Sequence, residues 1–82
     1  MKKNILIVDD HPIVSTGLQA LIEHTGEYGK IYVANNITSS HLLLKQEDIA
    51  IAIIDLELQD ANGMELIKYI HQTHINTKIL VY

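Results

Sequence analysis

The chain has 82 residues, a length that allows one domain with a modest core and leaves no room for a second domain. Of these residues 48% are hydrophobic and 20% are charged, which excludes a disordered chain, and the apolar runs are too short to span a bilayer. The net charge of -4 and the scattered lysines, without any arginine, exclude binding of a nucleic-acid backbone by this segment alone.

Cysteine is absent, which excludes a disulfide framework and a thiolate metal site. The first residues, MKKN, lead directly into a predicted strand and not into the apolar region of a secretory signal. We therefore expect a cytoplasmic protein without membrane contact.

The first predicted elements are a strand and a helix. Asn4–Val8 is almost wholly apolar and indicates a buried strand. Pro12 stands where the first turn of a helix tolerates proline, and Gly26 marks the end of that helix. The apolar positions of the helix recur at helical spacing and form one stripe: Ile13, Val14, Leu18, Leu21 and Ile22.

A second strand and helix follow a turn at Gly29. Ile31–Ala34 predicts a short strand. Ser39–Gln46 predicts a helix that begins with a capping serine or threonine, and Leu42 and Leu43 are expected to form its buried face.

The remaining elements are two strands with a helix between them. Ile49–Ile54 is apolar without alternation, which is typical of a central parallel strand covered on both faces. Asn62 and Glu65 resemble a capping box that opens a helix through His71. Lys78–Tyr82 predicts a fourth strand. The expected inward side of the last helix consists of Met64, Ile67 and Ile70.

Alternating strands and helices predict an α/β fold with a parallel sheet, in which ligands bind at the carboxyl ends of the strands. Asp9, Asp10 and Asp55 follow two of the predicted strands. If these strands are neighbours, about 4.8 Å apart, the three carboxylates converge. At about 5 Å and an effective dielectric constant of about 20, each ionised pair repels by roughly 3 kcal/mol, so a cation or protons must compensate. Mg2+ suits such an all-oxygen site and favours phosphoryl chemistry.

Simpler interpretations exist for some of these residues. Asp10 alone could be the N-cap of the following helix, but capping needs one oxygen and does not account for three aspartates. His11 is interpreted as a residue at the rim of the pocket and not as a base. His71 and His74 could share a metal, but without a third ligand a solvated helix end is the favoured interpretation.

Two stretches of the sequence resemble the receiver domain of bacterial response regulators: ILIVDDHPIVSTGLQALI and AIIDLELQDANGMELI. The DDHPIV motif with Gly17 and Leu18 is similar in particular to receivers that precede a LuxR/NarL-type helix-turn-helix output domain. The resemblance spans residues 1–82 as one receiver domain. It implies a CheY-like (flavodoxin-like) doubly wound parallel sheet of strand order 2-1-3-4-5, truncated here to about four strands and three helices.

The resemblance also implies roles for the acidic residues. Asp55 matches the phosphoacceptor that takes a phosphoryl group from a sensor histidine kinase, and Asp9 and Asp10 match its acidic pair. Mg2+ would be bound by Asp10, Asp55 and the backbone carbonyl of Glu57, and by Asp9 through water. The implied protein controls transcription in its full-length form and is not an enzyme, beyond self-phosphorylation from phosphodonors and autodephosphorylation.

Some features depart from the family pattern. Gln59 replaces a usual proline, and Ser15 replaces a frequent arginine. The family's serine or threonine would come directly after Tyr82, and Lys78 does not match the family's lysine. The fourth helix, fifth strand, fifth helix and any DNA-binding output domain are absent, so DNA would be contacted only through that missing domain. An exposed fourth-strand edge and uncovered apolar residues on the first helix or the sheet predict self-association.

Two alternatives to a working phosphoacceptor stay open. The first is a receiver-like scaffold that acts only in protein association, although the three aspartates favour phosphotransfer. The second is a phosphatase of the haloacid dehalogenase type. That class needs its nucleophile on the first strand with another aspartate two residues later, which the DLE sequence on the third strand does not match.

Overall fold

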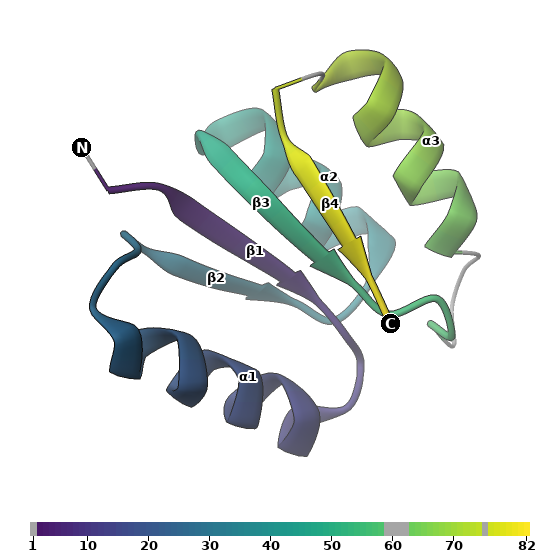
Figure 1. Ribbon diagram of the computed structural model, residues 1–82. Coiled ribbons are helices and arrows are strands. Elements are labelled where there is room, and N and C mark those ends of the chain that lie inside the picture. The colour runs from purple at the N-terminus through teal and green to yellow at the C-terminus, as the bar shows by residue number, and fades with distance from the viewer. Residues whose placement is uncertain (1, 59–62, 75) are drawn as a thin grey trace.

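The computed structural model describes residues 2–58, 63–74 and 76–82. They form four strands and three helices in alternation (Figure 1), so the predicted α/β fold is confirmed. Gln59, which replaces the family's usual proline, and Asn62 of the predicted capping box lie outside the described residues. The elements are β1 (Asn4–Val8), α1 (Pro12–Thr25), β2 (Ile31–Ala34), α2 (Ile37–Gln46), β3 (Ile49–Ile54), α3 (Gly63–Thr73) and β4 (Lys78–Val81).

All strand pairs in the sheet are parallel, and the strand order is β2-β1-β3-β4. The step from β1 to β2 runs in the opposite direction from the steps to β3 and β4. Because crossovers between parallel strands are right-handed, α1 must lie on one face of the sheet and α2 and α3 on the other. Figure 1 shows this division, with α1 beside β1 and β2. None of the described helices has the length and apolar character needed to traverse a bilayer.

The main core lies between the sheet and the α2 and α3 helices. Residues on one face of β1, β2 and β3 meet side chains from both helices there. Because strand residues alternate between faces, Leu6 and Val8 of β1 and Ala52 and Ile54 of β3 point into this core together. Its buried members are Leu6, Val8, Ala34, Leu44, Ile49, Ala52, Ile54, Leu58, Leu66 and Ile70.

The opposite face of the sheet carries an apolar row that α1 covers only in part. The strand register places its members side by side: Val33, Ile7, Ile53 and Leu80. Ile7 is fully buried, whereas Leu80 on β4 is 57% exposed. On α1, Ile13 is 89% exposed and Leu21 is also exposed. The expected uncovered apolar residues are therefore present on both the first helix and the sheet.

The α2 helix differs from its prediction in its start and in its buried face. It begins at Ile37, and its N-cap is Asn36, whose side chain accepts a hydrogen bond from the Ser39 N–H at 2.8 Å. The capping residue is therefore not a serine or threonine. Leu44, at 3% exposed, faces the core, while Leu42 is 53% exposed and Leu43 is partly buried.

The reason for this difference is the position of Ser40. Its side chain is fully buried against the sheet and donates a hydrogen bond to the Asn36 carbonyl at 2.7 Å. Leu44 follows Ser40 by one helical turn, so it shares the same inward face. Any one of the three consecutive leucines could have faced the core. Because the small Ser40 fits against the sheet, the leucine on the same helix face, Leu44, is the one that is buried.

Two elements near the C-terminus also differ from prediction. In α3 the buried side chains are Leu66 and Ile70, while Met64 is exposed and Ile67 is partly buried. The helix runs to Thr73, and β4 ends at Val81. Tyr82, predicted as the last residue of the fourth strand, directly follows β4 and is 47% exposed; β4 pairs only with β3 among the described strands.

Leu44→Ala is expected to lower the free energy of unfolding by about 2–5 kcal/mol, because it leaves a cavity in the core. Leu42→Ala, the matched control on the same helix, should change it by less than about 0.5 kcal/mol. Urea unfolding followed by circular dichroism measures both variants. Equal losses would contradict the assignment of Leu44 to the core and of Leu42 to the surface.

Gly63→Ala should destabilise the fold by about 1–3 kcal/mol, because inserted atoms displace a tightly packed backbone. An added Cβ would lie 3.0 Å from both the Asp55 carbonyl oxygen and the Leu56 Cα. Gly17→Ala is the control, because a Cβ there meets nothing within 4 Å. Alanine should stabilise that helix interior by up to about 1 kcal/mol. Thermal denaturation that shows equal tolerance at both positions would contradict this packing.

Candidate functional site

The candidate site lies at the carboxyl ends of β1 and β3, which are neighbours in the sheet. Backbone hydrogen bonds continue the sheet pattern one residue past each strand. The Asp9 N–H donates to the Ala34 carbonyl at 3.0 Å, and the Asp55 N–H donates to the Val8 carbonyl at 2.9 Å. These bonds fix the backbone of both aspartates. Ligand atoms of Asp9, Asp10, His11 and Asp55 lie within 4.8 Å of one another, so the predicted convergence of the carboxylates is confirmed.

Asp9 is the most buried carboxylate of the cluster. Its Oδ1 accepts hydrogen bonds from the His11 N–H at 2.8 Å and from His11 Nδ1 at 2.7 Å. Its Oδ2 accepts one from the Tyr82 hydroxyl. Burial alone would raise the pKa of Asp9, but the hydrogen bonds from Tyr82 and His11 outweigh it, so the pKa lies below its ordinary value.

Asp10 is placed in the cluster and does not cap α1. The N-cap of that helix is His11, in an extended conformation and without a side-chain capping bond. An oxygen of Asp10, Oδ1, lies 3.1 Å from His11 Nδ1. The simpler interpretation of Asp10 as a helix cap is therefore wrong.

Asp55 is buried at the end of β3 and held in one orientation. Its Oδ1 accepts a hydrogen bond from the Glu57 N–H at 2.9 Å. This bond links the side chain to the backbone two residues later. Its Oδ2 lies 3.4 Å from His11 Nδ1. Glu57 itself is exposed, and the predicted use of its carbonyl as a metal ligand stays a prediction.

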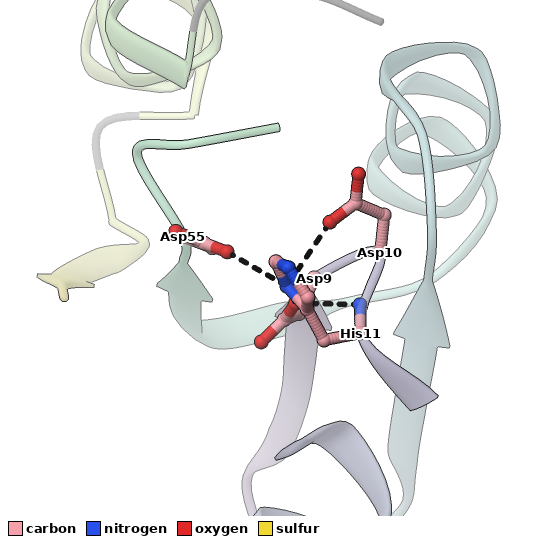
Figure 2. Close-up of side chains that lie close together, drawn as sticks. All are labelled: Asp9, Asp10, His11 and Asp55. Carbon is pink, nitrogen blue, oxygen red and sulfur yellow. Dashed lines mark hydrogen bonds and ion pairs between the residues drawn. The ribbon is translucent and has the colours of Figure 1, made fainter. Parts of the chain in front are cut away.

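The His11 ring lies among the three carboxylates (Figure 2), while its side chain remains 52% exposed, as suits a residue at the rim of the site. The hydrogen bond to Asp9 raises the pKa of His11 above its ordinary value; burial opposes this rise, and the charges of Asp10, Asp9 and Asp55 add to it. Sequence reasoning placed His11 in the correct turn, but the direction of its ring depends on the folded geometry.

Tyr82 is the second residue whose position in the site was not predicted. It follows β4, and its backbone continues the pairing with β3 through a hydrogen bond from its N–H to the Ile54 carbonyl at 3.1 Å. Burial of the hydroxyl and its hydrogen bond to Asp9 raise the pKa of Tyr82, so the hydroxyl stays protonated to a higher pH than that of an ordinary tyrosine. Only the strand order brings a residue 73 positions away to Asp9, so no local sequence signal marks it.

The donor set of the cluster fits a hard divalent cation. Three carboxylates offer oxygen ligands, which Mg2+ prefers, and leave room for waters. Among the described residues, no group of three or more possible metal ligands includes His71 or His74. The ring of His74 lies near that of Tyr69, with ring centroids 5.6 Å apart and the ring planes tilted by 56°.

Sequence comparison matches residues 5–82 to the response regulator receiver domain. The transcriptional regulatory protein YdfI of Bacillus subtilis is 36% identical over 77 residues, which cover 94% of this chain and 36% of YdfI. ComA of the same species is 34% identical over 84 residues, covering 98% of this chain and 38% of ComA. The chain thus spans little more than a third of the length of these curated relatives.

Solved structures agree with this assignment. The MaeR response regulator bound to beryllium trifluoride superposes with a TM-score of 0.91 at 28% identity, over 98% of this chain and 66% of that chain. The non-phosphorylated receiver domain of RcsB from Escherichia coli gives a TM-score of 0.86 at 28% identity, over 99% of this chain and 64% of that one. The chain therefore belongs to the response regulator receiver domain family, with relatives among the NarL- and ComA-type transcriptional regulators.

Proposed function

We propose that this receiver domain accepts a phosphoryl group on Asp55 from a sensor histidine kinase, with Mg2+ bound by the adjacent carboxylates. The observation that carries the proposal is the buried carboxylate of Asp55, held by the Glu57 N–H within a cluster of two further carboxylates. A structural salt bridge or a helix cap would not need three carboxylates within 4.8 Å. Phosphoryl transfer needs in-line positioning and positive charge, and this cluster is suited to bind the cation that supplies it.

In this mechanism the chain contributes the nucleophile and its orientation. An Asp55 oxygen attacks the phosphorus of the kinase phosphohistidine; the new P–O bond forms as the P–N bond breaks, and the leaving imidazole takes a proton. The Glu57 N–H holds the other carboxylate oxygen at 2.9 Å, which limits rotation of the nucleophile. Asp10, Asp55 and the Glu57 carbonyl would hold Mg2+ directly, and Asp9 through water. Bound Mg2+ would offset negative charge on the transferring group.

The proposed cellular context follows from the relatives. RcsB from Salmonella enterica serovar Typhimurium is described bound to the promoter rprA in the presence of the phosphomimetic BeF3-, and it superposes on this chain with a TM-score of 0.87 at 28% identity. By analogy, phosphorylation of Asp55 would control transcription through an output domain, which would make the DNA contacts. We place the protein in the cytoplasm, where kinase and DNA are accessible, and regard it as a phosphoacceptor and not as an enzyme.

Intact mass spectrometry after incubation with Mg2+ and acetyl phosphate tests the phosphoacceptor. We expect one phosphoryl adduct on the wild type and none on Asp55→Asn, with EDTA abolishing the adduct and Asp10→Asn strongly reducing it. Circular dichroism establishes that each variant is folded. A folded wild type without an adduct, or an adduct that persists on Asp55→Asn, would contradict the proposal.

A second proposal is self-association, and the exposed apolar row on the α1 face of the sheet supports it. The row ends at Leu80 on β4, and β4 pairs on one side only among the described strands. An edge strand offers unpaired backbone donors and acceptors, and an adjoining apolar surface adds a driving force for pairing with a second copy. A two-fold axis would pair the β4 edges and bring the two apolar rows together. The same surface would also support association in the alternative in which the chain is a receiver-like scaffold without phosphotransfer.

Sedimentation velocity over a range of concentrations tests self-association. We expect the wild type to form a dimer that Leu80→Lys weakens at least about tenfold, because a charge would be buried at the new interface. Leu42→Lys, a matched change of an exposed leucine on the other side of the sheet, should leave dimer formation unchanged. A monomeric wild type at high concentration would contradict the proposal.

A further inference from the structure

The His11 ring occupies the centre of the acidic cluster (Figure 2). Its Nδ1 lies 2.7 Å from Asp9 Oδ1, 3.1 Å from Asp10 Oδ1 and 3.4 Å from Asp55 Oδ2. One nitrogen atom is therefore within reach of an oxygen from every carboxylate in the site. A cation held directly by Asp10 and Asp55, and by Asp9 through water, would have to enter the space between these carboxylates, which the ring occupies.

The three carboxylates determine whether His11 Nδ1 carries a hydrogen. An ionised carboxylate only accepts hydrogen bonds, so the Nδ1 that faces Asp9 must carry a hydrogen. A nitrogen that carries a hydrogen has no lone pair available for a metal. Mg2+ binds oxygen at about 2.0–2.1 Å, so an ion among these oxygens would overlap with the imidazole. The ring and the ion exclude each other from this position.

The surroundings of His11 allow its ring to leave. The side chain is 52% exposed, and the residue lies between β1 and α1 with an extended backbone. Two hydrogen bonds of His11 do not involve its ring. Its backbone N–H donates to Asp9 at 2.8 Å, and its carbonyl accepts from the Ser15 N–H at 3.1 Å. A change of side-chain rotamer can therefore carry the imidazole into solvent while the turn remains intact.

We propose that His11 occupies the cation position of the metal-free site, and that Mg2+ binds only by displacing the imidazole. The inference rests on the proposed Mg2+ site and adds a determinant of its affinity. The Nδ1 hydrogen bond to Asp9 and the close approach to Asp10 and Asp55 must be given up when the ion enters. The apparent affinity for Mg2+ is then lowered in proportion to the fraction of molecules in which the site is open. His11 is a determinant of Mg2+ affinity in this scheme and not a ligand.

Isothermal titration calorimetry with Mg2+ on the full chain measures the effect of the ring. His11→Ala is expected to bind Mg2+ about fivefold to tenfold more tightly than the wild type, which corresponds to the loss of one modest hydrogen bond. His24→Ala is the matched control, because His24 is exposed in the last turn of α1, away from the cluster. Its affinity should equal that of the wild type.

Nuclear magnetic resonance of the histidine ring nitrogens gives an independent readout on the wild type. Saturation with Mg2+ should move the Nδ1 resonance of His11 to the value of a solvent-exposed ring, and leave His24 unchanged. This measurement needs no substitution, so it remains informative if His11→Ala folds poorly.

The outcomes separate this inference from the proposed function. Tighter binding by His11→Ala, with displacement of the wild-type ring, supports it. Equal affinities of wild type and variant overturn the inference and leave the Mg2+ site intact. Weaker binding by the variant also overturns it, because His11 would then be a ligand. If neither protein binds Mg2+, both the inference and the proposed metal site are overturned.

Discussion

The parallel pairing of β1 with β3 is the constraint on which the site depends. It places Asp9 and Asp55 next to each other at the edge of the sheet, and backbone hydrogen bonds past the strand ends keep them there. Neither residue can move away without breaking the ends of two buried strands. The repulsion between the carboxylates must therefore be offset locally, and the donors to Asp9 and Asp55 include the Tyr82 hydroxyl, the His11 ring and two backbone N–H groups.

The two faces of the sheet make different contributions to this arrangement. On the α2 and α3 face, a closely packed apolar core includes the last residues of the strands, Val8 and Ile54, directly before the aspartates. Packing at these positions limits movement of the adjoining carboxylates. On the α1 face the apolar row is buried at Ile7 and exposed at both ends, 40% at Val33 and 57% at Leu80. The position of the site thus depends on the core between the sheet and the α2 and α3 helices, while the apolar row on the α1 face is the surface suited to association.

Sequence reasoning predicted the strands well because continuous apolar runs have few other interpretations, and β1, β2 and β3 begin and end where expected. The convergence of the aspartates followed from the neighbouring first and third strands, a relation taken from the family resemblance. The buried face of each helix was harder to predict, because a segment with several adjacent apolar residues can turn more than one of them towards the core. Leu42 and Met64 were assigned inward on this basis and are exposed. The contacts of His11 and Tyr82 depend on side-chain direction and on strand order, which local patterns do not specify.

Tyr82 joins the exposed edge of the sheet to its acidic cluster. Its N–H bonds to the Ile54 carbonyl, its own carbonyl accepts from Leu56 N–H at 3.2 Å, and its hydroxyl donates to Asp9. The backbone thus pairs with β3 on both sides of Asp55, while the side chain reaches β1. Because a tyrosine hydroxyl is protonated at neutral pH, the contact lasts as long as Asp9 keeps an accepting oxygen. Any ligand that changes the charge around Asp9 therefore acts on a hydrogen bond that also holds the end of β4.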